Sequence, residues 1–459
     1  MNRTPPPQQW RSAIPAGAVF PAAHSLTTPQ LSPLLVLALV AGAVIYNAVL
    51  AWLTARGVWI GSRHVIAAEF LVLAATSLTL LVWGRRSDDG IPLLFAGFFI
   101  VGSLLISMGS QALYPEMARN AVIAALFLML GMRAGPAGLR LCFAIAAAVV
   151  AAGLMLEIAD ARAYVDLFEP ARYYQLTRGS EPLEWVDGLY RNASGFEGRF
   201  AIANIIDHRA SSIFLEPVSL GNFGVVLIGF VTCFWERLKR IEKVAYVALA
   251  ILILLTTNSR ILLGFMALCP LIYFVAPRAS RNRRLVILPA VLAVAVLVYF
   301  TGPEIYADNL TGRIGKAVHN LTELGVPGLF GASPELASGF SDSGFAFVIA
   351  ASSAFGLMVL WLFISLVVPE QNVLQRRAGL FLCFYVALSL LISGTSVFSI
   401  KVAALLWLLM GVAAALAPDG EAGAETAPAG TQNGGWRVEP RARSARGPSA
   451  TWADQGIAR

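Results

Sequence analysis

Long apolar runs separated by short polar pieces fill the chain between residues 31 and 417. The runs are about 16–25 residues long, and a helix of ~20 apolar residues spans the hydrocarbon core of a bilayer. Backbone amides inside that core have no water to bind, so such segments form helices or closed barrels. Barrel strands alternate apolar and polar residues, and these runs do not alternate. The pattern therefore predicts an all-α polytopic membrane protein.

We expect about twelve transmembrane helices and two large external loops, at about 159–212 and 301–342. Loops this long are usually either functional or disordered, and their many aromatic residues argue against disorder. Within the first loop, the stretch AYVDLFEPARYYQL at 163–176 has apolar residues at helical spacing, which predicts an interfacial helix. The predicted spans cover residues 31–53, 65–83, 91–108, 117–132, 140–158, 213–234, 244–258, 261–276, 285–300, 343–367, 379–394 and 398–417.

Composition agrees with this pattern and delimits the membrane domain. Only 13% of the 459 residues are charged, about half the share in a soluble protein. Residues 1–30 are rich in Pro and residues 418–459 in Gly, Ala, Pro and Arg, so we expect both tails to be disordered and 31–417 to form the membrane domain. The four cysteines lie in or beside apolar runs without metal-ligand spacing, so we expect no metal and no cofactor.

The distribution of positive charge sets the expected orientation. Most of the 34 Lys and Arg residues fall in the tails and in every second loop. Cytoplasmic loops of membrane proteins carry such an excess, so we expect both termini in the cytoplasm and the two long loops outside. The net charge of +7 follows from this arrangement and does not indicate a nucleic-acid partner.

Charged residues on the predicted outer face are candidates for function, because charges in or beside a span are costly. Each also has a structural interpretation: an arginine can reach the headgroups or pair with a nearby carboxylate, His319 can be an ordinary loop histidine, and Asp342 can cap a helix. The candidates lie in four segments: HRASSIFLEPVSLGNF (208–223) with Arg209 and Glu216, TTNSRILLGF (256–265) with Arg260, NLTGRIGKAVHN (309–320) with Arg313, Lys316 and His319, and GFSDSGFAFVIAASSAFG (339–356) with Asp342.

Together these segments place three arginines and two carboxylates on one face of the membrane. Arginine stays charged and binds phosphate oxygens with two parallel hydrogen bonds, so the arginines suit a diphosphate and can stabilise it as it leaves. A carboxylate can accept the proton of an attacking sugar hydroxyl. The set fits glycosyl transfer from a lipid diphosphate better than ion transport, because its charges gather at one face instead of the bilayer midplane.

In these segments the sequence resembles the O-antigen polymerase and O-antigen ligase family of polytopic membrane glycosyltransferases. The stretches RASSIFLEPVSLGNF, NSRILLGF, TGRIG and GVPGLFGASP follow the family's order over residues 208–367. The resemblance implies a bacterial inner-membrane enzyme that is independent of metal and acts on oligosaccharides linked to undecaprenyl diphosphate, with a chain-length regulator and export machinery as partners. It implies diphosphate clamps at Arg209, Arg260 and Arg313, a base or acceptor-positioning role for Asp342 with Glu216 as second choice, and secondary candidates at Lys316, His319 and Arg199.

Within the family we favour a polymerase over a ligase. Ligases carry a His, usually His-Asn, where the second large loop re-enters the membrane, and here that position holds Asp342-Ser343. The pair His319-Asn320 lies about 22 residues earlier. The alternatives are a ligase, for which His319 would be essential, and a flippase or other transporter, for which Glu69 and Lys401 are the chief intramembrane candidates. A peptidoglycan-type polymerase and a membrane scaffold are weaker alternatives.

Overall fold

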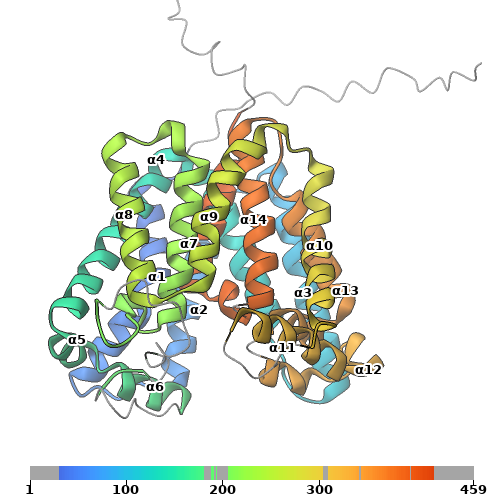
Figure 1. The fold of residues 1–459 in the computed structure, drawn as a ribbon, viewed down its shortest axis with the longest axis horizontal. Coiled ribbons are helices and arrows are strands. Elements are labelled where there is room, and N and C mark those ends of the chain that lie inside the picture. Colours follow the sequence, from blue (N-terminus) through green and yellow to red (C-terminus); the bar gives the residue numbers. More distant parts are fainter. Residues whose placement is uncertain are drawn as a thin grey trace, which may run out of the picture. The chain divides into compact units, whose positions relative to one another are not determined.

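The computed structural model describes residues 30–179, 188–190, 193, 205–302, 309–340, 343–392 and 394–417. Within these residues the regular structure is helical throughout and contains no strand, which confirms the all-α prediction. The α-helices, shown in Figure 1, are α1 Pro33–Ala55, α2 Ser62–Trp83, α3 Gly90–Ser110, α4 Glu116–Ala159, α5 Ala161–Phe168, α6 Pro170–Arg178, α7 Pro217–Cys233, α8 Arg240–Thr257, α9 Arg260–Val275, α10 Arg281–Tyr299, α11 Leu310–Glu323, α12 Gly325–Leu329, α13 Gly344–Leu366, α14 Val373–Ile392 and α15 Ile400–Ala414.

Eight helices of the described chain are long and apolar enough to cross a membrane, namely α1, α2, α3, α4, α9, α10, α13 and α14. The helices α7 and α15 are apolar but shorter. Helix α2 shows why such helices need lipid around them: Leu71 and Leu81 leave 68% and 78% of their surface exposed. Each predicted span falls on one of the helices, and the spans predicted at 117–132 and 140–158 both fall within α4.

A glycine and a proline divide α4 into two helical halves. Gly135 has φ +64°, a conformation that favours glycine, and Pro136 follows it. Just before this break, Arg133 forms an ion pair of 2.6 Å with Asp89 and donates to the carbonyl of Gly84 at 2.9 Å. Because the Arg133 side chain is only 4% exposed, this pair fixes the turn between α2 and α3 to the break in α4.

Two glycines allow α4 and α15 to cross in close contact at the centre of the bundle. A Cβ atom at Gly131 would collide with the carbonyl oxygen of Leu408, and one at Gly411 with that of Leu128. Both obstacles are helix backbone, which cannot move aside as a side chain can. The residues of α15 are buried along almost its whole length, so this crossing forms part of the main core.

We expect Gly411→Ala to destabilise the fold by about 1–3 kcal/mol, the usual cost of overpacking a core. The matched control is Gly97→Ala in α3, where a Cβ atom would meet nothing within 4 Å. That change should be neutral or stabilising by up to ~1 kcal/mol, because alanine favours helix more than glycine does. Thermal denaturation of the purified variants in one detergent gives the comparison, and equal melting temperatures would contradict the close crossing.

Short helices gather at one end of the bundle, where α5, α6, α11 and α12 lie (Figure 1). They correct the prediction of a single interfacial helix over 163–176, because the chain breaks at Glu169, which has φ +39°, and Pro170 then starts α6. Tyr164 and Tyr173 are almost fully buried, so they pack inside a small core of their own. The apolar spacing in this stretch therefore marks a core-facing surface and not a membrane-facing one.

Candidate functional site

A buried carboxylate fixes the irregular segment that leads into α7. Glu157, near the end of α4, is 1% exposed and accepts hydrogen bonds from the backbone N–H groups of Ser211 and Ser212, both within 3.1 Å. Ser212 and Leu215 have φ +47° and +60°, which are uncommon for these residues and need support from their surroundings. Glu157 therefore stabilises the turn on which the RASS stretch depends.

His208 adds a titratable contact to this support. Its Nε2 lies 3.4 Å from Glu157 and its Nδ1 lies 3.1 Å from Asp207. Burial disfavours the charged imidazole, but the hydrogen bonds and attraction of Glu157 and Asp207 outweigh burial and raise the pKa of His208 above its ordinary value. The folded protein therefore binds the imidazole proton more tightly than the unfolded chain does.

The His208 contact predicts a pH-dependent stability. Because the folded-state pKa is raised, the stabilisation is complete below the unfolded pKa of about 6.5 and is lost as pH rises through the folded value. We expect the melting temperature of the wild type to fall as pH rises above about 6.5, and to fall less in His208→Gln. Parallel slopes for the two proteins would show that His208 does not carry this linkage.

Arg209 connects the same segment to the turn between α8 and α9. Its guanidinium is buried and Nε donates to the carbonyl of Thr257 at 2.8 Å. The turn itself is set by Asn258, which has φ +53°, and by Ser259, whose hydroxyl caps α9. Arg260 follows as the first residue of α9. Hence Arg209 and Arg260, 51 positions apart, are held by adjoining backbone.

Arg313 comes from the second long loop. It lies on the amphipathic helix α11, which begins where the side chain of Asn309 accepts from the N–H of Gly312 at 2.7 Å. Its Nη1 donates to the carbonyl of Ile392, at the end of α14, at 3.2 Å. This contact directs the guanidinium toward the helical bundle.

All three predicted arginines, together with Glu216, line one cavity of about 1770 Å³. They reach it from three separate parts of the chain, namely the segment before α7, the start of α9 and α11. The structure thus brings together four of the residues selected from sequence patterns. The cavity is also lined by Tyr46, Asn47, Ser62, Val65, Ile66, Glu69, Phe70, Leu73, Ala74, Ser77, Glu116, Arg119, Asn120, Tyr173, Tyr174, Arg178, Tyr190, Ser219, Asn222, Ser396, Ser399 and Lys401, among others.

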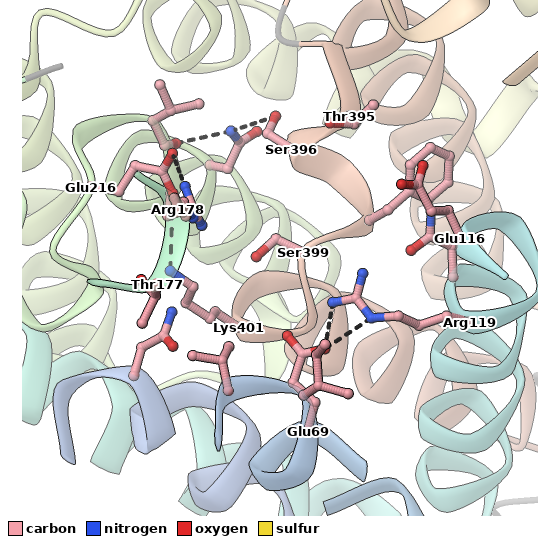
Figure 2. A pocket seen from close by; sticks show the side chains of 18 of the residues that line it. Glu69, Glu116, Arg119, Thr177, Arg178, Glu216, Thr395, Ser396, Ser399 and Lys401 are labelled. Carbon is pink, nitrogen blue, oxygen red and sulfur yellow. Dashed lines mark hydrogen bonds and ion pairs between the residues drawn. The ribbon is translucent and has the colours of Figure 1, made fainter. Parts of the chain in front are cut away.

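Glu216 is the centre of a charged group in this cavity (Figure 2). Its carboxylate lies 3.5 Å from Arg178 and 3.9 Å from Lys401, and it accepts from the hydroxyl of Ser219 at 3.1 Å. Burial works against its charge, yet Arg178 and Lys401 hold the pKa of Glu216 below its ordinary value. The carboxylate is therefore ionised at neutral pH and fixes two cations beside the three predicted arginines.

Sequence patterns did not reveal Arg178, and they identified Lys401 only as a costly charge within an apolar run. Arg178 is the last residue of α6, and its guanidinium lies 4.6 Å from the ring centre of Tyr174. Tyr174 and Tyr164 in turn donate to the carbonyls of Phe214 and Ser212. The segment between α4 and α7 thus contributes a cation to the cavity. The basic residue that ends the amphipathic stretch RYYQLTR could have indicated it.

The first-choice base, Asp342, lies outside the described part of the chain, and the secondary candidates lie away from the cavity or outside that part. Among the described residues, Lys316 and His319 do not line the cavity, and His319 lies 3.3 Å from Glu323 on the same helix. Asp342 and Arg199 lie outside the described residues. Within the described ranges, no three His, Cys, Asp or Glu side chains come together as a metal site would require.

Comparison with known proteins found no family model, no curated protein and no solved structure that matches this chain.

Proposed function

We propose that this protein is a membrane glycosyltransferase that polymerises oligosaccharide repeat units carried on undecaprenyl diphosphate. The observation that carries the proposal is the convergence of Arg209, Arg260 and Arg313 with Glu216 on one cavity. A cavity lined by several fixed guanidinium groups suits a diphosphate, because each group can form paired hydrogen bonds with phosphate oxygens. The polar residues and tyrosines beside them suit a glycan.

The proposal includes a topology of twelve crossings in a bacterial inner membrane. The two halves of α4 would cross separately, α8 would cross in addition, and α7 and α15 would be short crossings. Both termini would be cytoplasmic, in keeping with the distribution of Lys and Arg. The end of the bundle that carries α5, α6, α11 and α12 would then face outward, and the cavity would open where the lipid-linked glycan is presented.

In the proposed reaction, a hydroxyl oxygen of one repeat unit attacks the anomeric carbon of the growing chain. A new C–O bond forms, the bond from that carbon to the phosphate oxygen breaks, and undecaprenyl diphosphate leaves with the bonding electrons. The arginines stabilise the charge on the departing diphosphate. The acceptor's proton passes to a carboxylate, for which Asp342 is the first choice. Glu216 is the second, and its low pKa suits the fixing of Arg178 and Lys401 better than proton transfer.

A transporter of lipid-linked oligosaccharides is the second candidate. The observation that favours it is that Glu69 and Lys401, both within apolar helices, line the same large cavity as the arginines. A ligase has less support, because His319 lies outside the cavity lining and beside Glu323. The three functions differ in the glycans that accumulate when the site is damaged.

Deletion of the gene in its host, followed by complementation, tests the proposal. Wild type, Arg260→Ala, His319→Ala and the control Arg172→Ala, which removes an exposed ion pair with Glu169, would be matched for membrane level. We expect Arg260→Ala alone to lose long chains and accumulate single repeat units on a gel of extracted glycans. Polymer that accumulates on its lipid carrier only in His319→Ala would indicate a ligase. Normal polymer in every variant would overturn the site assignment.

A further inference from the structure

The wall of the cavity opposite Glu216 carries a second polar cluster, built by α1, α2 and α4 (Figure 2). Glu69 accepts from the hydroxyl of Tyr46 at 2.6 Å and from Nε of Arg119 at 2.8 Å, and Nη2 of Arg119 lies 2.6 Å away. Glu69 is roughly 10 Å along α2 from its first residue, at 1.5 Å per residue. Burying a carboxylate this far along a membrane helix costs free energy, so such a residue is a candidate for function.

One buried polar atom of this cluster has no hydrogen-bond partner among the described residues, and two exposed groups have hydrogen-bonding capacity left. The Asn120 side chain lines the cavity and is only 6% exposed, yet its Oδ1 accepts no hydrogen bond. Arg119 contacts Glu69 through Nε and Nη2, so Nη1 can donate to another acceptor. The Arg119 side chain is 42% exposed. Glu116, one turn before Arg119, lines the cavity as an exposed carboxylate. A buried polar atom without a partner is costly unless a ligand satisfies it.

The charge of the cluster identifies the class of ligand. The opposite wall has four arginines and one lysine against one glutamate, which attracts an anion. In this cluster one positive charge, on Arg119, lies beside the two negative charges of Glu69 and Glu116. The carboxylates would repel an anion, and the guanidinium would repel a cation. A neutral molecule with many hydroxyls fits best, because each hydroxyl both donates and accepts. The ring of Phe70, which also lines the cavity and is 69% exposed, offers apolar surface for the C–H face of a sugar.

We propose that Glu69, Glu116, Arg119 and Asn120 form a glycan-binding subsite that takes neutral sugar rings of the repeat unit while the arginine wall holds its diphosphate. The identity of the ligand rests on the proposed function, but the subsite can be tested without any polymerisation. Both polar groups line the same cavity of about 1770 Å³, so a single substrate can reach both.

The test measures the binding of two probes separately to the full-length protein in lipid nanodiscs. The probes are inorganic diphosphate and the free saccharide released by mild acid from the lipid carrier of the deletion host. We expect Glu69→Gln and Arg119→Ala to raise the saccharide Kd about tenfold or more and to leave the diphosphate Kd unchanged, since each removes charged hydrogen-bonding groups. Arg260→Ala should show the reverse. The control Arg172→Ala should change neither value.

Asn120→Leu provides a second test of the subsite if Glu69→Gln or Arg119→Ala fails to fold. Leucine has a similar size and removes the unpartnered oxygen, so we expect a melting temperature equal to or above that of the wild type together with a weaker saccharide affinity. A purely structural role for Asn120 predicts a loss of stability and unchanged affinity.

The two proposals fail separately in this design. Wild-type saccharide affinity in both Glu69→Gln and Asn120→Leu, or no saccharide binding by the wild type, overturns the glycan subsite. Diphosphate binding that is unaffected by Arg260→Ala counts against the proposed function and leaves the subsite standing.

Discussion

Arg260→Ala is expected to lower the rate of glycan polymerisation about a hundredfold or more, which is typical for the loss of one group that stabilises charge on a leaving group. Arg260 is the first residue of α9 and lines the cavity beside Arg209, whose Nε is committed to the carbonyl of Thr257. The large effect follows because the guanidinium is already in place at the cavity wall and needs no reorganisation as charge develops on the departing diphosphate.

Arg260→Lys separates charge from geometry. Lysine keeps the positive charge but lacks the paired hydrogen bonds of a guanidinium, so we expect an intermediate rate, on the order of tenfold below wild type. Initial rates of chain formation by purified protein in nanodiscs provide the measurement, with Arg172→Ala as the control outside the cavity. A wild-type rate in Arg260→Ala would remove this residue from the mechanism.

The second large effect is expected on stability, from Glu216→Gln. Lys401 is 3% exposed and Arg178 lies 3.5 Å from the same carboxylate, so the substitution leaves buried positive charge without its counter-charge. Removing one partner of a buried ion pair typically costs about 3–5 kcal/mol. We expect a marked fall in melting temperature, and a partial recovery in the double variant Glu216→Gln/Lys401→Gln, which removes the uncompensated lysine as well.

The matched comparison for Glu216→Gln is Ser219→Ala. This change removes a neutral hydrogen bond of 3.1 Å to the same carboxylate and should cost only about 1 kcal/mol. The single variant Lys401→Gln completes the comparison. If Glu216→Gln/Lys401→Gln loses as much stability as Glu216→Gln and Lys401→Gln added together, Glu216 and Lys401 are not energetically coupled.

The arginines could be selected from sequence because each lies beside a turn at the end of an apolar run. Their convergence could not, since it depends on contacts between distant elements. One such contact lies between Gly221 of α7 and Ser259, which caps α9. A Cβ atom at position 221 would lie 2.6 Å from Ser259 Oγ, so this close approach requires glycine. Arg313 reaches the same cavity through its bond to Ile392. No periodicity in either segment encodes these neighbours.

Arg119 and Glu69 are single charges in helices that are apolar on most sides. In such a helix hydropathy does not say which face looks inward, so Arg119 carried no signal and Glu69 was notable only for its cost. A charge at the opposite end of the bundle has a structural role that its sequence position did not indicate. Arg284 contributed to the predicted orientation, yet it is 1% exposed and donates to the carbonyl of Val368 at 2.6 Å. This arginine, which counts toward the predicted orientation, therefore also stabilises the fold.

Reconstitution of the purified protein with its lipid-linked repeat unit as the sole substrate tests the central claim most directly. We expect a ladder of longer glycans on the carrier lipid, with one undecaprenyl diphosphate released for each bond formed, and the loss of both products in Arg260→Ala. Repeat units that stay intact with wild-type protein, or that cross the bilayer without joining, would contradict it.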